Sequence, residues 1–315
     1  MPRLVFGIRD SNLSTNLPMR AGTQMAARRR ALLLANPKAR RGAEGVQAAS
    51  DVLRGSGVDL VVESIANSKE IAEHVRRHAG DVDLIVLGGG DGTINAALAS
   101  LLETRLPLGI LPLGTANNTA RTLGIPTELA DAAAVIAAGR TRQIDVGQVG
   151  DRHFLTTASI GLSVRITKEL SDASKRRWGP LAYGVAALRA LSKLDPFEAE
   201  IHHDAGSRRL RAIQIMIGNG RHYGAALTVS EAARPDDALL DCYAIEAVPW
   251  WRLLGLLPAL KRGSHGDKAD VQAITSRTVR IETPEPHRID ADGELIGKTP
   301  ATFSTLPLAL EVFVP

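Results

Sequence analysis

One turn of this sequence combines residues that bind phosphate groups with an acid. An apolar run at residues 84–87 is followed by GGGDGT at residues 88–93 and by a stretch with helical spacing from Ile94. Consecutive glycines let backbone N–H groups approach a ligand, and a following helix directs its positive dipole end at the same space. The Asp91 carboxylate repels phosphate oxygens unless a cation or a hydrogen-bond network intervenes. The turn therefore predicts a nucleotide held through Mg²⁺ and phosphoryl transfer.

Two better-known phosphate-binding patterns are missing from the sequence. There is no G-x-x-x-x-G-K-[ST] string, and no G-x-G-x-x-G string followed by a ribose-binding acid. The turn is therefore not a Walker phosphate-binding loop, and a dinucleotide-dependent oxidoreductase is disfavoured.

Two further turns carry polar groups suited to the same chemistry. In LPLGTANN at residues 111–118, Thr115 can donate to a phosphate, and Asn117 or Asn118 can cap the next helix. In DADGE at residues 290–294, Asp292 and Glu294 flank a glycine, an arrangement that can present a general base or a metal ligand. The same Asp-Gly pair also favours an ordinary hairpin.

Strand-like and helix-like segments alternate over the first part of the chain. Strands are expected at residues 31–35, 58–63, 84–87 and 108–111, and helices at residues 43–53, 69–78, 93–101 and 117–123. This alternation predicts a parallel sheet with helices on both faces, which binds ligands beyond the carboxyl ends of its strands. Both polar turns of the first half follow such ends.

The pattern changes after Gly139. Strands expected in mostly antiparallel order lie at residues 146–149, 154–159, 198–203, 210–218, 239–245, 278–281 and 308–314, with helical inserts near residues 163–192 and 249–261. The predicted fold is thus α/β: an N-terminal parallel-sheet nucleotide-binding domain at residues 31–145, then a mostly antiparallel β-sandwich domain at residues 146–315. Residues 1–30 are predicted to be a flexible extension, and the final segment is a candidate for returning to the first domain.

Composition excludes some classes of function. The 315 residues include 38 basic and 34 acidic ones, a net charge of +4 that suits an anionic ligand or membrane surface. No basic stripe is interleaved with aromatic residues, so nucleic acid is not an expected partner. The single cysteine, Cys242, excludes internal disulfides and is typical of a reducing compartment, hence the cytoplasm. No apolar run reaches the roughly 18 residues that span a bilayer.

Five short motifs, in their order along the chain, resemble the diacylglycerol kinase catalytic family, most closely its bacterial soluble lipid-kinase branch. They are Asn36-Pro37, GGDGTIN at residues 89–95, GTANN at residues 114–118, GNG at residues 218–220 and DGE at residues 292–294. GGDGT alone also occurs in NAD kinases and 6-phosphofructokinases, whereas GTANN followed by ARTLGIP is more specific to lipid kinases. The resemblance covers residues 31–313. It implies an ATP- and Mg²⁺-dependent kinase whose second domain binds the lipid substrate, diacylglycerol by default.

The resemblance also implies roles for individual residues. Glu294 is favoured as the base on the lipid hydroxyl, Asp292 as its partner or a Mg²⁺ ligand, and Asp91 as a second Mg²⁺ candidate, directly or through water. A threonine is common in the family where Ser64 stands. The implied ATP-site residues are Asn36, Pro37, Lys38, Ala39, Arg40, Ser64, Gly89, Gly90, Asp91, Gly92, Thr93, Ile94, Asn95 and Thr115.

A second, structural cation site is implied at residues 234–241. Asp237 matches the family's carboxylate ligand, and Arg234 and Leu239 match its two carbonyl positions. Ala238 replaces the usual glycine, which adds strain if this residue takes a positive φ.

Membrane contact and two rival functions complete the predictions. The cluster at residues 175–178 (KRRW) and the tryptophans at 250–251 suit peripheral binding at the inner face of the membrane. No obligatory protein partner is evident, and a homodimer is left open.

One rival function is a kinase of a soluble acceptor, similar to NAD kinases. The other is a nucleotide-binding regulator with little catalysis.

Overall fold

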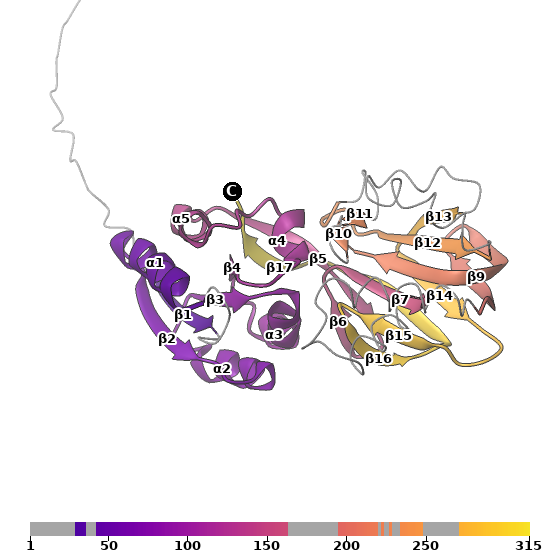
Figure 1. Ribbon diagram of the computed structural model, residues 1–315, viewed down its shortest axis with the longest axis horizontal. Coiled ribbons are helices and arrows are strands. Elements are labelled where there is room, and N and C mark those ends of the chain that lie inside the picture. The colour runs from indigo at the N-terminus through magenta and orange to yellow at the C-terminus, as the bar shows by residue number, and fades with distance from the viewer. Residues whose placement is uncertain are drawn as a thin grey trace, which may run out of the picture.

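The computed structural model describes residues 29–35, 42–162, 195–219, 222–223, 227–228, 234–247 and 271–315. These residues form two lobes that lie side by side, one with strands and helices and one built of strands (Figure 1). The predicted helical inserts, the N-terminal extension to residue 28, and the motifs at 36–40, 175–178 and 250–251 lie outside the described residues.

The first lobe contains a parallel sheet in the order β4-β3-β1-β2. Its strands are β1 (Arg30–Ala35), β2 (Asp59–Ser64), β3 (Leu84–Gly89) and β4 (Leu108–Pro112). The three inner strands are almost wholly buried because their apolar runs are covered on both faces, as parallel strands require. β2 lies at the edge and alternates in exposure.

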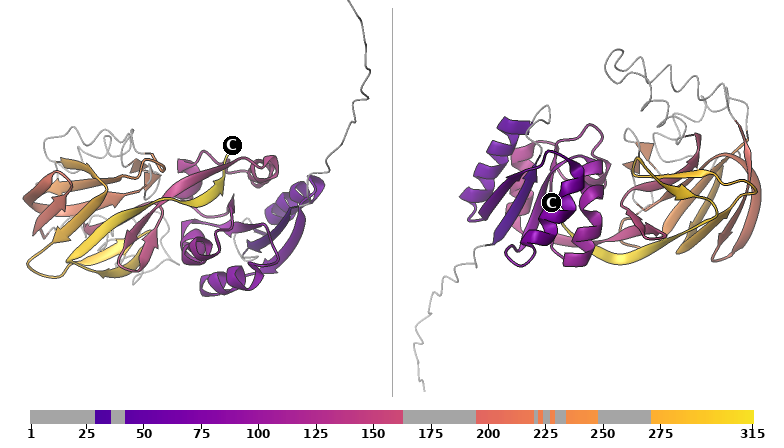
Figure 2. Two further views of the ribbon diagram at one scale, coloured as in Figure 1. Left: turned by 180° about the vertical axis from the view of Figure 1, so that it is seen from behind. Right: turned by 90° about the horizontal axis from the view of Figure 1, so that it is seen from below.

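Helices cover both faces of this sheet (Figure 2). They are α1 (Gly42–Gly55), α2 (Ile71–His78) after a 3-10 turn (Ser68–Glu70), α3 (Asp91–Thr104), α4 (Asn118–Thr122) and α5 (Leu129–Ala138). α1 packs against α5, and α2 packs against α3. α5 is not predicted from the sequence, because its alanine-rich segment shows little contrast between an apolar and a polar face.

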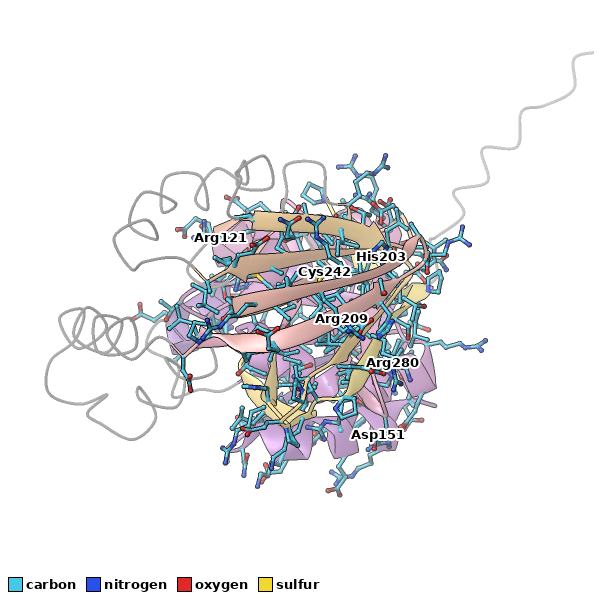
Figure 3. The ribbon with its side chains drawn as sticks, turned by 90° about the vertical axis from the view of Figure 1, so that its right-hand side faces the viewer. Arg121, Asp151, His203, Arg209, Cys242 and Arg280 are labelled. Atoms are coloured by element: carbon cyan, nitrogen blue, oxygen red, sulfur yellow. The ribbon has the colours of Figure 1, made fainter. Side chains whose placement is uncertain are left out.

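The second lobe is antiparallel and has its own core. Its strands are β6 (Arg152–Phe154), β7 (Thr157–Gly161), β8 (Phe197–His203), β9 (Gly206–Gly218), β12 (Leu240–Glu246), β13 (Val271–Ser276), β14 (Thr278–Glu282), β15 (Arg288–Ala291) and β16 (Glu294–Lys298). The short strands β10 (His222–Tyr223) and β11 (Leu227–Thr228) pair separately. Cys242 is buried on β12 inside this core (Figure 3). The predicted fold class is confirmed.

Two long strands join the lobes. β5 (Thr141–Val149) and β17 (Ala301–Phe313) pair antiparallel and run from one lobe into the other (Figure 1). β17 also pairs with β14 of the second lobe and, in parallel, with β4 of the first. One 15-stranded sheet therefore passes through both lobes. β17 begins well before residue 308, where the sequence suggested a start, and is interrupted near Leu308, whose φ is 50°.

Candidate active site between the two lobes

The carboxyl ends of the four parallel strands meet at one edge of the sheet. Ala35, at the end of β1, is in register with Ser64 on β2 and with Gly88 on β3, and Gly89 is in register with Pro112 on β4. The predicted ATP-site residues at or just after the ends of β2, β3 and β4 thus lie along one edge of the sheet.

The glycine-rich turn opens helix α3 without a side-chain cap. Gly90 is the N-cap residue, and among the described residues no side chain caps the first turn, where the Thr93 N–H donates to the Gly90 carbonyl at 2.9 Å. At Gly92 an added Cβ would meet nothing within 4 Å, so the turn is open on that side. Uncapped N–H groups at a helix start bind anions, and this arrangement fits a phosphate. Ile94 contributes only its backbone, because its side chain is buried in the core.

The second polar turn packs directly on the first. A Cβ at Gly114 would lie 2.6 Å from the Cα of Gly90, so this contact requires the absence of side chains. The Leu113 N–H donates to the Gly89 carbonyl at 2.9 Å. Thr115 is exposed beside this contact. The two turns therefore form one surface.

Asp91 fastens the two turns together. Its carboxylate oxygens accept hydrogen bonds from the N–H groups of Asn118 and Thr119, each at 2.9 Å, and so cap helix α4. Asn117 occupies the N-cap position of this helix, as expected, but its side chain makes no capping hydrogen bond. The Asn117 side chain instead bonds to the N–H and carbonyl of Gly114, at 3.0 and 2.9 Å.

The predicted acidic turn is the hairpin between β15 and β16, and Asp292 anchors it. The Asp292 carboxylate accepts from the N–H groups of Leu155, Thr156 and Thr157, at 2.7, 3.0 and 3.0 Å, and from the Thr156 hydroxyl. Loss of hydration raises the pKa of Asp292, and these four hydrogen bonds oppose that rise. Asp292 thereby attaches the hairpin to the segment between β6 and β7.

Glu294 is held differently from Asp292. Its side chain is 50% exposed, and the Arg152 guanidinium lies 3.7 Å from its carboxylate. Ion pairs this exposed are weak. Glu294 therefore presents its oxygens at the surface, while the strand that Asp292 anchors fixes its backbone. β6, which carries Arg152, also packs against α3, so the acidic turn is linked to the helix that the glycine-rich turn opens.

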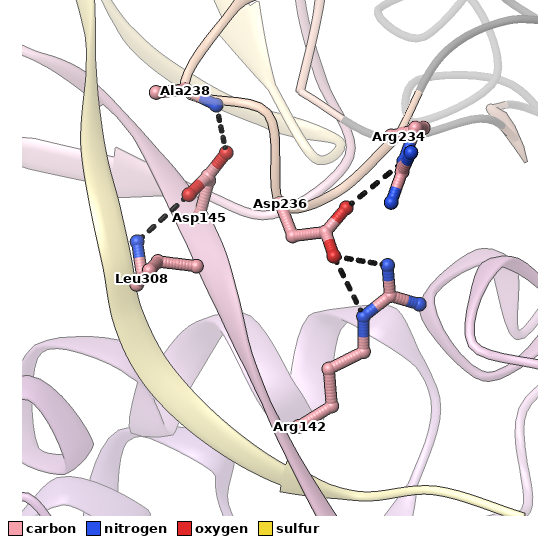
Figure 4. Close-up of polar contacts among 6 residues, drawn as sticks. All are labelled: Arg142, Asp145, Arg234, Asp236, Ala238 and Leu308. Carbon is pink, nitrogen blue, oxygen red and sulfur yellow. Dashed lines mark hydrogen bonds and ion pairs between the residues drawn. The ribbon is translucent and has the colours of Figure 1, made fainter. Parts of the chain in front are cut away.

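A buried acid that the sequence analysis missed lies where the lobes join. Asp145 on β5 is 1% exposed. Its carboxylate accepts from the N–H groups of Ala238 and Leu308, both at 2.7 Å (Figure 4). Both of those residues have a positive φ, 59° and 50°, so the strain expected at Ala238 is present. The available signal was an acid between the apolar residues Ile144 and Val146.

The predicted cation-binding segment surrounds Asp145. Asp237 accepts from the Leu239 N–H at 3.0 Å. Burial raises the pKa of Asp237, and the nearby charges of Asp145 and Asp236 add to the rise. Asp236 is paired with Arg142, and Arg234 lies 3.4 Å from it (Figure 4). Over the described part of the chain, no three His, Cys, Asp or Glu side chains converge on a metal position. A cation here would therefore depend on backbone carbonyls.

Asn219, from the GNG motif, connects the acidic turn with this region. Its side-chain N–H₂ donates to the carbonyls of Asp145, at 3.0 Å, and Leu155, at 3.3 Å. Its own N–H donates to the Thr156 carbonyl at 2.9 Å. The segment that Asp292 holds is thus held from its other side as well.

Comparison with known proteins assigns this architecture to a family. Residues 30–149 match the diacylglycerol kinase catalytic domain, and residues 156–314 match the YegS C-terminal NAD kinase beta sandwich-like domain. The chain is 33% identical to a diacylglycerol kinase of Mycobacterium tuberculosis over 296 residues, covering 90% of this chain and 94% of the relative. The chain belongs to the diacylglycerol kinase family of bacterial lipid kinases.

Other relatives of this lipid kinase agree. An Enterobacter sp. (strain 638) protein named "Probable lipid kinase YegS-like" is 31% identical, with 92% of this chain and 98% of the relative covered. A crystal structure of a diacylglycerol kinase from Bacillus anthracis superposes with a TM-score of 0.73 at 25% identity, covering 91% and 97% of the two chains. The protein is accordingly a kinase that phosphorylates a lipid hydroxyl. No helix in the described ranges is long and apolar enough to cross a membrane.

Proposed function

We propose that this lipid kinase transfers the γ-phosphoryl group of ATP to the hydroxyl of a diacylglycerol-like lipid, with Glu294 as the base. The observation that carries the proposal is the contrast within the acidic turn. Asp292 has both oxygens occupied by four donors, whereas Glu294 is half exposed beside it. A general base needs a free lone pair and a fixed position, and this pair of residues provides both.

The glycine-rich surface fits the nucleotide. The start of α3 would bind phosphate oxygens through backbone N–H groups. We propose that Thr93, Asn95, Thr115 and Ser64 complete the nucleotide site. Residues 36–40 stay a prediction. When bound, ATP supplies the phosphoryl group and Mg²⁺ neutralises its developing charge. Mg²⁺ is usually held by one or two carboxylates together with substrate phosphates, so the lack of a cage of side chains in the described residues is compatible with it.

Each acid then has a distinct proposed role. Glu294 accepts the proton of the lipid hydroxyl as that oxygen bonds to phosphorus. Asp292 holds the hairpin against the segment that follows β6, and Asp91 holds the two glycine turns together. Each Asp91 oxygen accepts one N–H and retains a second lone pair, which permits contact with Mg²⁺ through water.

We also propose a structural cation at the Asp237 carboxylate and the carbonyls of Arg234 and Leu239. The nearby charges of Asp145 and Asp236, which help to raise the pKa of Asp237, are a surplus that a cation would neutralise. Chelation should then lower the melting temperature of the wild type but not of Asp237→Asn, measured by differential scanning calorimetry. Equal melting of the wild type with and without chelator would contradict this site.

Partner and location follow from the acceptor. A membrane lipid requires contact with a membrane surface, and we propose peripheral contact at the cytoplasmic face. The basic and tryptophan clusters predicted for it lie outside the described residues, and a homodimer likewise stays a prediction.

The test is transfer of label from [γ-³²P]ATP with Mg²⁺ to lipids in mixed micelles. The acceptors are dioctanoylglycerol, phosphatidylglycerol and sphingosine, with NAD as a soluble acceptor. Label in a lipid supports the proposal. Label only in NAD would favour the NAD-kinase-like rival, and ATP binding with no label in any acceptor would favour the regulatory rival.

A further inference from the structure

Arg152 is a positive charge beside the acidic turn, and its side chain is only loosely held there. Its guanidinium lies 3.7 Å from the Glu294 carboxylate, beyond hydrogen-bonding distance, and both side chains are about half exposed. Over the described part of the chain, this ion pair is the one contact of the guanidinium. An arginine fork carries several N–H donors, and an exposed ion pair contributes little stability. The donors of Arg152 are therefore available to a stronger acceptor.

The backbone of Arg152 is well fixed, although its side chain is loose. Arg152 is in register with Val149 on β5, and β6 packs against α3, the helix that the glycine-rich turn opens. The segment that follows β6 donates three N–H groups to Asp292. Arg152 is thus tied by packing to the helix proposed to bind phosphate, and by the hydrogen bonds of its own segment to the turn that carries Glu294.

The acidic turn contains more acidic than basic groups. Asp290, Asp292 and Glu294 alternate along it, and in the described ranges Arg152 is the one cation within 4 Å of any of these carboxyl groups. Phosphoryl transfer brings further negative charge to this turn, because the hydroxyl that Glu294 deprotonates must bond to phosphorus. Carboxylates and phosphoryl oxygens repel each other unless cations lie between them. Mg²⁺ is one such cation in the proposed mechanism, and Arg152 is the side chain held at this turn that can be another.

We infer that Arg152 is a further catalytic residue, whose guanidinium binds the phosphoryl group as that group passes from ATP to the lipid hydroxyl. This inference rests on the proposed function. As the lipid oxygen bonds to phosphorus, the bond from phosphorus to the ADP oxygen breaks and the hydroxyl proton passes to Glu294. Arg152 neither gains nor loses a proton. It exchanges a weak partner, Glu294, for phosphoryl oxygens, which a guanidinium binds bidentately, and so leaves the Glu294 oxygens to accept the proton.

The phosphorylated product keeps the group that Arg152 binds, so product affinity tests this contact without turnover. Dioctanoylphosphatidate and dioctanoylglycerol share both acyl chains and differ only in the phosphate group. In isothermal titration calorimetry with mixed micelles, the wild type should bind the phosphatidate at least about 10-fold more tightly than dioctanoylglycerol. Arg152→Ala should raise the Kd of the phosphatidate about 10- to 100-fold and leave the Kd of dioctanoylglycerol unchanged.

Further variants locate the effect at the guanidinium. Arg152→Lys keeps the charge but not the fork, so it should recover only part of the product affinity. Arg288→Ala removes an exposed arginine from the opposite end of the same hairpin, and as the matched control it should change neither Kd. In a Glu294→Gln background, Arg152→Ala should weaken product binding by the same factor, because the contact is with the phosphate itself. In single-turnover assays, Arg152→Ala should slow phosphoryl transfer about 10²- to 10³-fold, with the Kd for ATP within about 3-fold of the wild type.

Each outcome decides between the possibilities. Equal wild-type affinities for the two lipids would overturn the inference while leaving the kinase function intact, and this comparison requires no variant to fold. An effect of Arg152→Ala that disappears in the Glu294→Gln background would mean that Arg152 acts only through the base, and would also overturn it. An equal loss of affinity for both lipids would mean a structural role, with the same consequence. Phosphorylation of no lipid in the transfer assay would overturn the proposed function, and this inference with it.

Discussion

The glycine-rich turn and the acidic turn are fastened by the same device but present different groups. In the first, Asp91 accepts two backbone N–H groups and joins two loops of the α/β lobe. In the second, Asp292 accepts three N–H groups and a hydroxyl and attaches a hairpin to the segment after β6. The first turn then presents backbone donors, which suit phosphate, and the second presents the half-exposed carboxyl group of Glu294.

This difference separates residues that build the site from residues that act in it. An aspartate with both oxygens on backbone N–H groups is well placed to fix a loop and poorly placed to take a proton. A neighbouring acid such as Glu294 is then held in a fixed position, and its own oxygens remain available to accept a proton. The comparison therefore predicts that substitutions at Asp292 and Asp91 act mainly on stability and positioning, and that those at Glu294 act on chemistry.

The largest effect on stability is expected at Asp292. Asp292→Asn replaces one acceptor oxygen with a donor that faces the Leu155 N–H, so the free energy of unfolding should fall by about 3 kcal/mol. Urea unfolding followed by circular dichroism measures this change. Asp151→Asn, an exposed turn residue of the same lobe, is the control. An Asp292 variant as stable as the control would contradict the claim that Asp292 stabilises the acidic turn.

Asp290 should have a smaller effect that depends on pH. The pKa is about 6 in the folded state against an ordinary value of 3.8, so ionisation is less favourable in the folded protein. The wild type must then lose stability as the pH rises from about 4 to about 6, and Asp290→Asn, which does not titrate, must not. The free energy of unfolding of Asp290→Asn, relative to that of the wild type, should therefore rise by about 2 kcal/mol between pH 4 and pH 8. A pH-independent difference in the urea midpoints would contradict this.

Asp91 should give the smallest change in stability. Asp91→Asn weakens the cap of α4, which is worth about 1 kcal/mol. Because the cap also joins the two glycine turns, we expect the Kd for ATP to rise about 5- to 10-fold, measured by isothermal titration calorimetry. Asp131→Asn in the first turn of α5 is the matched control. An ATP affinity equal to that of the control would show that the hydrogen bonds between Asp91 and α4 do not contribute to nucleotide binding.

Most of the first lobe could be predicted from the sequence, because its apolar runs and helical spacings are local signals. The sequence also predicted that the two glycine turns lie together, since parallel strands end at one edge of the sheet. It did not predict the hydrogen-bond partners of the acids. Asp91 binds residues 27 and 28 positions away, and Asp292 binds residues more than 130 positions away. Which carboxylate is occupied and which is free depends on such tertiary contacts.

The most direct test of this division of roles is the single-turnover rate of phosphoryl transfer in Glu294→Gln. We predict that the rate falls by about 10²- to 10⁴-fold, as expected for loss of a general base. ATP affinity and the urea midpoint should equal those of a Glu285→Gln control, which changes an exposed acid before β15. A rate within about 3-fold of the wild type would contradict the account, because Glu294 would then not be the base that Asp292 positions.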